Sequence, residues 1–448
     1  MMFDLAIIGG GPAGYTAAER AAQRGLTVVL FEKKQLGGVC LNEGCIPTKT
    51  LLYSAKLYQN AQTSSKYGIT LDLLAFDYEK IVARKNKIVR KLNAGIRAKM
   101  SENNITVING EAAIKKATTH IEIVCNNELI EAKNLILATG SSHVIPPIKG
   151  LDSTSFWTNT EALEIKSVPE SLVIIGGGVI GLEFAGLFNT FGTTVTVIEM
   201  APEILPGIDS EIATLLRTEY AKKGITFHIN AQVQEVTNQN VIFATSEGTE
   251  SIAANQILLS VGRQPYLENL GLESVLLERF HKGVAVNLHM QTSHPHIYAI
   301  GDITGFSMLA HTASREAEVA INHLLGIDDE MNYGAVPAVI YTNPEVAGVG
   351  ATEDALKAKG NKYQVAKLPM TFSGRFVAEN EGGNGLCKLI FNEQQQLIGA
   401  HMIGNPASEL IAIAALAIEQ ELTLEQFKKL IFPHPSVGEI FKETLFSL

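Results

Sequence analysis

Short apolar runs alternate along the chain with glycine-rich turns and amphipathic stretches. Residues 5–8 are apolar, three glycines follow at once, and residues 12–23 mix alanines with polar side chains at helical spacing. Gly25 ends this stretch, and the β-branched residues 27–29 open a second apolar run that closes on Glu32. Helical periodicity predicts a helix, and short apolar runs bounded by turns predict buried strands. The pattern therefore predicts a strand–helix–strand unit and an α/β fold.

This unit occurs twice, because residues 7–33 align without a gap on residues 174–200. The alignment pairs Gly9, Gly11, Gly14 and Glu32 with Gly176, Gly178, Gly181 and Glu199. In a dinucleotide-binding unit the first glycine permits a tight turn, and the second lets the backbone approach a pyrophosphate. The third lets the helix pack on the strand, and the acidic residue accepts hydrogen bonds from the ribose. One glycine motif is a weak signal, but two complete copies predict two dinucleotide sites.

The acidic residue of the second copy bears on cofactor choice. Glu199 would repel a 2′-phosphate, and residues 200–202 (Met-Ala-Pro) supply no Arg to receive one. We therefore expect the second site to prefer NAD(H) to NADP(H).

Composition narrows the class of protein. The 448 residues are 46% apolar and 18% charged, which predicts large cores rather than disorder. The net charge of −10 argues against non-specific binding of nucleic acid or an anionic membrane. The start of the chain lacks the pattern of a secretory signal, and the apolar stretch 172–188 is interrupted by glycines and Glu183. We expect a soluble, cytoplasmic protein with no membrane span.

Two of the four cysteines, Cys40 and Cys45, lie close together directly behind the first unit. A zinc site would need a second ligand pair, and Cys125 and Cys387 stand alone, so we expect no metal. Two buried structural thiols remain an alternative. We favour a redox-active pair because the cysteines open a predicted helix, whose positive end stabilises a thiolate. Lys49, one turn beyond Cys45, adds a cation on the same helix face.

Residues 37–52, GGVCLNEGCIPTKTLL, resemble the active-site disulfide segment of the FAD-dependent pyridine nucleotide–disulfide oxidoreductases. Residues 138–140, 260–265 and 299–302 resemble further motifs of that family in the family's order. The resemblance implies an FAD domain in two parts, residues 1–145 and 266–334, with an NAD domain inserted at 146–265. Residues 335–448 would form a C-terminal α+β dimerisation domain. The implied fold class is α/β, with two Rossmann-like dinucleotide-binding domains.

The resemblance also implies the residues that hold the two cofactors. For FAD these are Gly9, Gly11, Gly14, Glu32, Lys49, Ala112, Thr139, Gly140, Asp302, Met308, Leu309, Ala310 and His311. For NAD they are Gly176, Gly178, Gly181, Glu199 and Gly262.

Four further roles follow from the same resemblance. Cys40 would exchange with the disulfide substrate, and Cys45 would lie against the flavin. Lys49 would approach the flavin ring and pair with Glu183. The alternative for Glu183 is a solvent-facing helix residue.

The catalytic base is expected near the C-terminus. Oxidation of a dithiol needs a proton acceptor that titrates near neutral pH, and His is the usual choice. Residues 432–439, FPHPSVGE, resemble the family's His-Pro-Thr segment, which makes His434 the base and Glu439 the residue that orients it. The segment departs from the family at Phe432, where a second His is common, and at Ser436 and Gly438. In the family this pair reaches the disulfide of the other subunit, which implies a homodimer.

Within the family, residues 308–311 and 339–345 most resemble members that oxidise protein-bound dihydrolipoamide with NAD⁺. The implied partner is a lipoyl-carrying protein of a 2-oxoacid dehydrogenase or glycine cleavage complex. The alternative is another NAD(P)H-dependent flavin reductase that acts on a small disulfide. We expect no nucleic-acid partner.

One basic stretch stands apart from the acidic chain. Residues 80–99 hold eight Lys or Arg and no Asp or Glu, and interleaved apolar residues predict an amphipathic helix. A solvated basic face is the expected role of these charges, and a docking surface for an acidic partner is the alternative.

Overall fold

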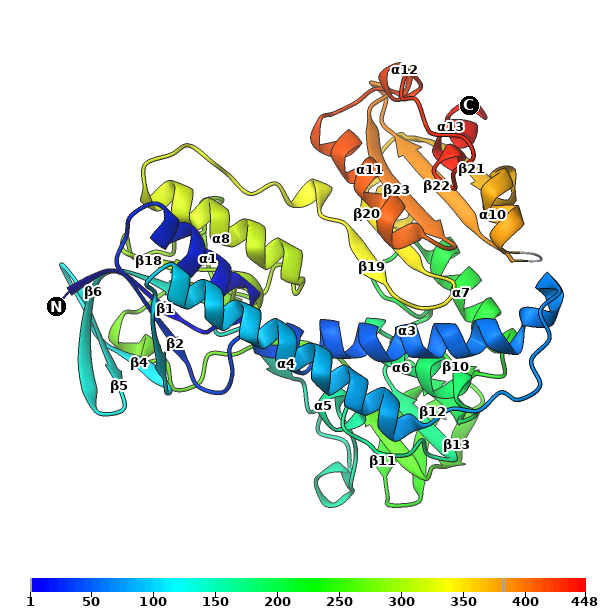
Figure 1. The fold of residues 1–448 in the computed structure, drawn as a ribbon, viewed down its shortest axis with the longest axis horizontal. Helices are drawn as coiled ribbons and strands as arrows, with labels where there is room; N and C mark the ends of the chain where they lie inside the picture. Colours follow the sequence, from blue (N-terminus) through cyan, green and yellow to red (C-terminus); the bar gives the residue numbers. More distant parts are fainter. Residues whose placement is uncertain (1, 381–382) are drawn as a thin grey trace. The chain divides into compact units, whose positions relative to one another are not determined.

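The computed structural model describes residues 2–380 and 383–448, which form two compact units. The first unit contains residues 1–50, 82–144 and 262–331, and the second contains residues 51–81, 145–261 and 332–448. Figure 1 shows the helices and strands of each unit. Each unit therefore combines segments that lie far apart in the sequence.

The first unit is built on a seven-stranded sheet with the order β3-β2-β1-β6-β5-β4, in which β18 also pairs with β6. Its strands are β1 (Met2–Ile8), β2 (Val28–Glu32), β3 (Thr106–Asn109), β4 (Ala112–Ala117), β5 (Ile121–Cys125), β6 (Glu128–Leu137) and β18 (Ile297–Ala299). Strands β1, β2, β3, β6 and β18 pair in parallel, whereas β4, β5 and β6 form an antiparallel meander. Parallel strands joined by a crossover helix are the arrangement of a Rossmann-like sheet.

The helix that joins β1 to β2 is α1 (Pro12–Gln23). It begins with Pro12, whose fixed φ suits the first helical position. Its buried residues are mainly alanines, and these small side chains allow close packing against α8 (Ala310–Leu324) (Figure 1). Gly25 follows with a φ of +85°, a left-handed conformation that glycine adopts without strain and that ends the helix.

The second unit contains the second predicted nucleotide-binding sheet. This four-stranded parallel sheet has the order β10-β9-β8-β14. The strands are β8 (Ser171–Ile175), β9 (Thr194–Ile198), β10 (Thr226–His228) and β14 (Gln256–Leu259), with helices α6 (Val179–Thr190) and α7 (Ser210–Lys222). An antiparallel sheet adds β11 (Gln232–Val236), β12 (Asn240–Thr245) and β13 (Gly248–Ala253).

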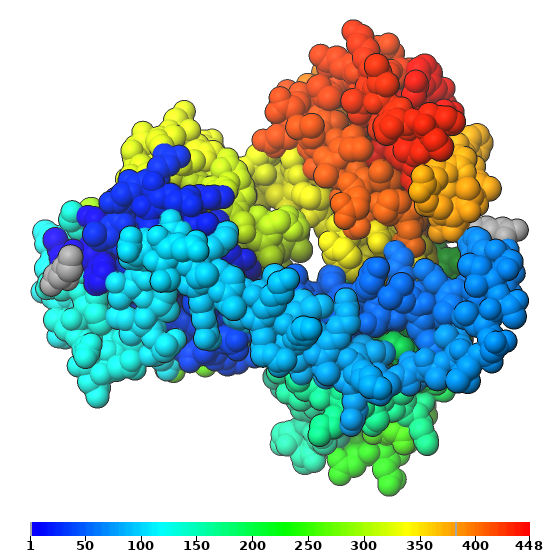
Figure 2. All heavy atoms as spheres, viewed as in Figure 1, coloured from blue at the N-terminus to red at the C-terminus, as the bar shows by residue number. Residues whose placement is uncertain are grey.

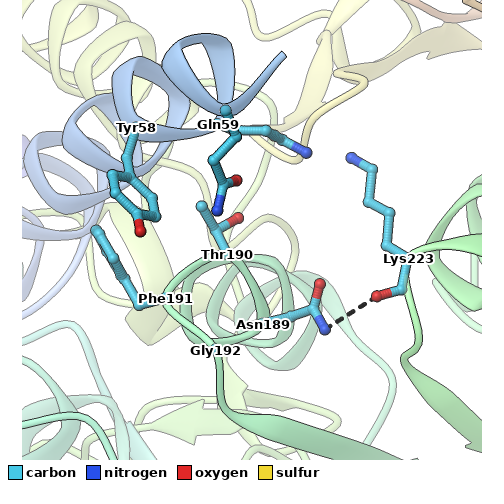
Figure 3. Close-up of a pocket in the computed structure, with 8 residues that line it drawn as sticks. Tyr58, Gln59, Asn189, Thr190, Phe191, Gly192 and Lys223 are labelled. Atoms are coloured by element: carbon cyan, nitrogen blue, oxygen red, sulfur yellow. Dashed lines mark hydrogen bonds between the residues drawn. The ribbon is translucent and has the colours of Figure 1, made fainter. Parts of the chain in front are cut away.

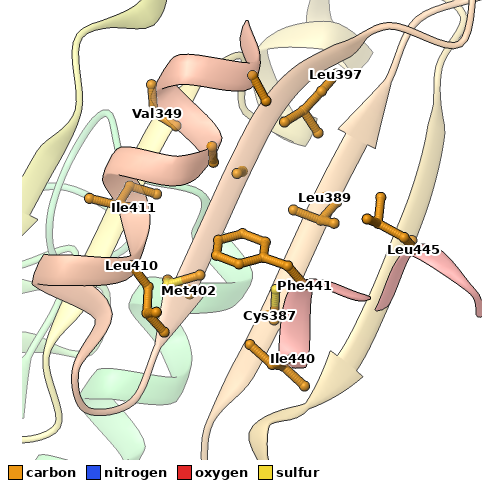
Figure 4. Packing of buried hydrophobic residues seen from close by; sticks show 14 of the residues in the cluster. Val349, Cys387, Leu389, Leu397, Met402, Leu410, Ile411, Ile440, Phe441 and Leu445 are labelled. Atoms are coloured by element: carbon orange, nitrogen blue, oxygen red, sulfur yellow. The ribbon is translucent and has the colours of Figure 1, made fainter. Parts of the chain in front are cut away.

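The C-terminal part of the second unit is a five-stranded antiparallel sheet with the order β19-β20-β23-β22-β21. Its strands are β19 (Ala338–Ile340), β20 (Val346–Gly350), β21 (Gln364–Pro369), β22 (Leu386–Phe391) and β23 (Leu397–Ile403). Helices α11 (Ala407–Glu419) and α13 (Glu439–Leu445) pack on it. Figure 4 shows Leu410 and Ile411 of α11 and Phe441 of α13 among the buried side chains of this core.

The remaining elements connect these sheets. The helices are α2 (Gly38–Asn42), α3 (Cys45–Gln62), α4 (Tyr78–Glu102), α5 (Asn159–Ala162), α9 (Glu353–Lys359), α10 (Gly374–Glu379) and α12 (Leu424–Phe427). Short 3₁₀ helices are η1 (Ser64–Tyr67), η2 (Leu151–Ser153), η3 (Leu272–Ser274), η4 (Gly301–Thr304), η5 (Tyr333–Ala335) and η6 (Met370–Phe372). Short strands are β7 (Ser141–His143), β15 (Arg263–Pro265), β16 (Arg279–Phe280) and β17 (Gly283–Val284). Among the described residues, no helix is both long and apolar enough to cross a membrane.

The α/β architecture, with two Rossmann-like sheets and a separate C-terminal antiparallel sheet, confirms the predicted fold class. The four predicted domain ranges stay a prediction. The compact units change after residues 144, 261 and 331, and residues 51–81, which we placed in the first FAD segment, fall in the second unit.

Candidate active site

The first glycine-rich turn connects β1 to α1, and its three motif glycines meet different surroundings. A Cβ at Gly9 would lie 2.2 Å from the Ala138 carbonyl oxygen, and a Cβ at Gly14 would lie 1.8 Å from the Gly9 carbonyl oxygen. A Cβ at Gly11 would meet nothing closer than 3.9 Å. The first and third glycines are thus required by the packing of the chain itself, whereas the second leaves space beside the backbone.

The second turn, between β8 and α6, repeats this construction. A Cβ at Gly176 would lie 2.5 Å from the Ser260 carbonyl oxygen, and one at Gly181 would lie 2.3 Å from the Gly176 carbonyl oxygen. Nothing lies within 4 Å of a Cβ at Gly178. Both turns therefore offer free backbone surface at the N-terminus of a 12-residue helix, which is where a pyrophosphate binds.

At each turn a glutamate carboxylate accepts hydrogen bonds from backbone N–H groups. Glu32 Oε2 accepts a hydrogen bond from Gly10 N at 2.8 Å, and its Oε1 accepts one from Lys34 N at 2.7 Å. Glu199 repeats both contacts, with Gly177 N at 2.6 Å and Ala201 N at 2.7 Å. The backbone thus holds each carboxylate at the end of the second strand, beside the turn.

The two cysteines lie in consecutive helices. Cys40 lies in the short helix α2, and Cys45 is the first residue of the 18-residue helix α3. The prediction that the pair opens one helix is therefore wrong for Cys40, because Glu43 and Gly44 interrupt the helix between them. Only Cys45 lies where the positive end of the helix dipole stabilises a thiolate.

Both cysteines are half-buried and are in the thiol form in this structure. The pKa of the Cys40 thiol is raised, first because Cys40 hydrogen-bonds to Cys45 and second because it is buried, while the Lys49 cation opposes the shift. These contacts favour the protonated form of Cys40. The charge of Lys49 acts on Cys40, and the role assigned to Lys49 stays a prediction.

A buried polar network lies in the same unit. Ser141 Oγ donates to Asp302 Oδ2 at 2.5 Å, and Arg263 donates to Ser141 through Nε at 2.8 Å and through Nη2, to the carbonyl oxygen, at 2.7 Å. Burial raises the pKa of Asp302 and lowers that of Arg263, whose charge also interacts with Cys45. Sequence reasoning assigned Asp302 but gave no role to Ser141 or Arg263.

The other residues assigned to FAD lie in this unit as well. Thr139 Oγ1 donates to the Tyr266 carbonyl oxygen at 2.6 Å, and Gly140 has a φ of +74°. Ala112 is buried in β4, and Leu309 is the N-cap residue of α8, directly after Met308 and before Ala310 and His311. Gly262, which we assigned to NAD, has a φ of +116° and lies next to Arg263.

These residues fit an FAD molecule. The open approach at Gly11 leaves space for a pyrophosphate, and Arg263 Nη1 is buried without a hydrogen-bond partner among the described residues. A buried N–H donor without an acceptor is costly, so a ligand oxygen or nitrogen that accepts a hydrogen bond from Nη1 would be stabilising. FAD would be held by the first turn, Glu32, and the network around Asp302.

Glu183 lies in α6 and is buried, with 3% of its surface exposed. The alternative of a solvent-facing residue is therefore wrong. Glu183 Oε1 accepts a hydrogen bond from Tyr341 N at 3.0 Å, in a segment that precedes β20. Its pairing with Lys49 stays a prediction.

The proposed base and its orienting carboxylate are in contact. His434 Nδ1 lies 2.9 Å from Glu439 Oε1, and Glu439 Oε2 accepts a hydrogen bond from Ser436 N at 2.8 Å. The Ser436 N–H and then His434 lower the pKa of Glu439, so this carboxylate stays ionised. The His434 side chain is 82% exposed, which leaves its Nε2 open to a substrate.

Phe432, where family members commonly carry a second His, packs in the C-terminal core. Its ring stacks on that of Phe441, with centroids 6.2 Å apart. This residue therefore anchors the segment that carries His434 rather than contributing a second titratable group.

A surface pocket of about 370 Å³ lies at the carboxyl end of α6 (Figure 3). Tyr58, Gln59, Phe191 and Lys223 are among its lining residues. It lies at the opposite end of α6 from the glycine-rich turn and contains none of the assigned residues. No cluster of three or more metal-ligating side chains occurs among residues 2–380 and 383–448.

Comparisons with known proteins show similarity along nearly the whole chain. Residues 3–317 match the family Pyridine nucleotide-disulphide oxidoreductase, and residues 336–445 match its dimerisation domain. The chain is similar to a dihydrolipoyl dehydrogenase of Bacillus subtilis (strain 168), with 36% identity over 99% of this chain and 98% of that protein.

Two solved structures resemble the chain over 99% of both lengths. One is LpdA from Mycobacterium tuberculosis, with a TM-score of 0.90 and 26% identity. The other is the HOCl-induced flavoprotein disulfide reductase RclA from Escherichia coli, with a TM-score of 0.86 and 29% identity. With both domain matches and a relative of 36% identity along its whole length, the chain belongs to the pyridine nucleotide–disulphide oxidoreductase family.

Proposed function

We propose that the chain is a dihydrolipoyl dehydrogenase, which oxidises protein-bound dihydrolipoamide to lipoamide and reduces NAD⁺. The observation that carries this proposal is the cysteine pair: Cys40 in α2 is hydrogen-bonded to Cys45, the first residue of α3. The similarity to dihydrolipoyl dehydrogenases over nearly the full length supports the same substrate class.

The two cysteines exchange electrons with the substrate in two steps. In the disulfide form, one substrate thiolate attacks Cys40 Sγ, which forms a mixed disulfide and releases Cys45 as a thiolate. The second substrate thiolate then attacks the substrate sulfur of this mixed disulfide. This attack closes the lipoamide ring and releases Cys40 as a thiolate. The substrate loses two electrons, and the cysteine pair gains them.

His434 accepts the protons that the substrate thiols lose. Its Nδ1 is hydrogen-bonded to Glu439, so its Nε2 is the free acceptor, and the ionised carboxylate stabilises the imidazolium that forms. We propose that His434 of one subunit serves the cysteines of the other, since its side chain is exposed and residues 336–445 match a dimerisation domain.

Each of the two glycine-rich turns binds one of the two cofactors. The first turn, Glu32 and the Arg263–Ser141–Asp302 network hold FAD, and the second turn with Glu199 holds NAD⁺. FAD, when bound, supplies the two-electron transfer from the dithiol to NAD⁺. The positive charge of Arg263 interacts with Cys45, and that of Lys49 interacts with Cys40.

A second candidate is a reductase of another small disulfide. The replacement of the second His by Phe432 and the similarity to RclA favour it. This candidate uses the same cysteines and turns but a different substrate.

Steady-state assays of the purified protein separate the two candidates. We expect NADH formation from free dihydrolipoamide and NAD⁺, slower turnover with NADP⁺, and little NAD(P)H oxidation with glutathione disulfide. Dihydrolipoamide should also convert a yellow protein to an orange-red one. Turnover of glutathione disulfide or another small disulfide in preference to lipoamide would favour the second candidate.

A further inference from the structure

The helix α4 carries a cluster of cations on one side. Lys87, Arg90, Lys91 and Arg97 are all exposed, and we call these four residues the basic face. At 100° per residue they occupy an arc of about 120° and a length of roughly 15 Å. In the space-filling view the atoms of this stretch lie at the surface of the face shown (Figure 2).

The charges of the basic face are not neutralised within the chain. No ion pair or hydrogen bond joins any of the four side chains to another of the described residues, 2–380 and 383–448. Lysines at both ends of the helix are paired, Lys80 with Asp77 at 3.0 Å and Lys99 with Glu19 at 3.2 Å. In a chain with a net charge of −10, this is a concentrated positive surface.

Residues beside the basic face of α4 contact the segment that carries the cysteines. Asn93 Nδ2 donates to Asn42 Oδ1 at 2.7 Å, and Asn42 Nδ2 donates to the Gly38 carbonyl oxygen at 2.9 Å, at the start of α2. Arg84 Nη1 donates to the Thr50 carbonyl oxygen of α3 at 3.2 Å. A partner bound to the basic face would therefore contact the same helix that hydrogen-bonds to the segment carrying the two cysteines.

We propose that the basic face binds an acidic protein domain that carries the dihydrolipoyl group, an inference that rests on the proposed function. Charge complementarity favours an acidic partner and raises the rate of encounter. Free dihydrolipoamide has no charge to offer, so the basic face discriminates between the carried and the free substrate.

Other occupants fit the basic face less well. A second copy of this chain in a two-fold contact would place like charges opposite one another. The apolar residues of α4 leave little surface to insert into a membrane, because Val82 and Met100 are buried, Ile88, Val89 and Ile96 are half-buried, and Leu92 is exposed. No aromatic side chain lies between Lys87 and Arg97 to stack on nucleic-acid bases.

The test is a charge-reversed variant, Lys87→Glu/Lys91→Glu, assayed as the full holoenzyme. Its substrates are free dihydrolipoamide and an acidic lipoyl domain carrying the reduced lipoyl group. We expect the KM for the carried substrate to rise about ten-fold or more because electrostatic steering is lost. The kcat and KM for free dihydrolipoamide should not change, which also shows that the variant folds. Added salt should raise the wild-type KM for the carried substrate more than that of the variant.

The matched control is Lys282→Glu/Lys359→Glu, which changes the net charge equally at two exposed lysines outside α4. It should retain the wild-type KM for both substrates. Equal effects of the two variants, or no effect of the first, would overturn the basic face as the docking surface. Loss of wild-type binding to anionic vesicles or single-stranded DNA in the first variant, with the lipoyl-domain KM unchanged, would assign the face to another ligand. A wild-type enzyme that does not oxidise free dihydrolipoamide would instead refute the proposed function and remove the premise of this docking site.

Discussion

At the scale of single residues, glycine positions are specified by two different requirements. Gly181 is needed by the fold, because its Cβ would lie 2.3 Å from the Gly176 carbonyl oxygen. Gly178 has a φ of −79°, which any residue adopts, and empty space around its Cβ position. The structure of the chain therefore does not explain Gly178, whereas a bound dinucleotide would.

This difference gives a prediction for the NAD⁺ site. Gly178→Ala should leave the free energy of unfolding nearly unchanged and raise the KM for NAD⁺ roughly ten-fold, equivalent to a loss of about 1.4 kcal/mol in binding. Reduction of the enzyme by dihydrolipoamide, followed by stopped-flow absorbance, should be unaffected. Gly181→Ala is the matched comparison and should lower the stability of the fold itself. An unchanged KM for NAD⁺ in Gly178→Ala would contradict the assignment of the second turn.

The residues that sequence reasoning missed depend on contacts with residues far away in the sequence. Ser141 contacts both Arg263 and Asp302, and 161 positions separate Ser141 from Asp302. Lys85 lies in the basic stretch expected to be solvated, yet only 1% of its surface is exposed. Helical spacing gives the face of a side chain, but the neighbours on that face come from the rest of the fold.

At the scale of elements, a buried ion cluster links helices to the C-terminal sheet. Lys388 of β22 pairs with Asp209, the N-cap residue of α7, at 2.9 Å and with Glu353 of α9 at 2.6 Å. The side chains of Lys388 and Asp209 are 2% and 0% exposed. Removing the cation would leave a buried carboxylate without a counter-charge, which is more costly than the absence of the whole pair.

Lys388→Met should therefore lower the free energy of unfolding by roughly 3–5 kcal/mol. Urea denaturation of the holoenzyme measures this change. Lys367→Met is the control, because Lys367 pairs with Glu211 at 2.7 Å but is half exposed, so its loss should cost less than about 1 kcal/mol. Similar losses in the two variants would show that the buried cluster has no special role.

The same cluster predicts how stability depends on pH. Hydrogen bonds from Lys357 and then Lys388 lower the pKa of Glu353 to about 2 from its usual 4.5. A lowered pKa contributes stability that is complete above the usual value and is lost as the pH falls toward 2. Over that range, the unfolding free energy of Glu353→Gln should decline less than that of the wild type. Parallel declines would exclude Glu353 as a source of the acid sensitivity.

At the scale of the whole molecule, we propose that the site combines residues of two chains. His434 and Glu439 lie in the region that matches a dimerisation domain, and both cysteines lie in the first unit. If one chain supplies the base and the other the cysteines, two inactive variants can complement each other. The net charge and the basic face act at this scale too, because they select which partners approach.

Cys40→Ser and His434→Gln should each abolish lipoamide turnover with flavin still bound. A random mixture of the two chains should recover about a quarter of the wild-type activity, because half of the dimers are mixed and each has one complete site. Separate affinity tags verify that mixed dimers form. A mixture of Cys40→Ser with Cys45→Ser is the control and should stay inactive, since both cysteines of a pair come from one chain. Inactive mixed dimers of the first pair would place the base elsewhere.

The sequence by itself determined the features that depend on neighbouring residues: the two strand–turn–helix units, the acidic residue that closes each turn, the cysteine pair and the α/β class. Turns and helix starts are governed by local backbone geometry, so a short pattern is sufficient to predict them. Only the tertiary structure decided the Arg263–Ser141–Asp302 network, the burial of Glu183 and the ion cluster around Lys388. Each of these depends on contacts between residues more than a hundred positions apart, whose proximity arises from packing and from the cost of burying charge without a partner.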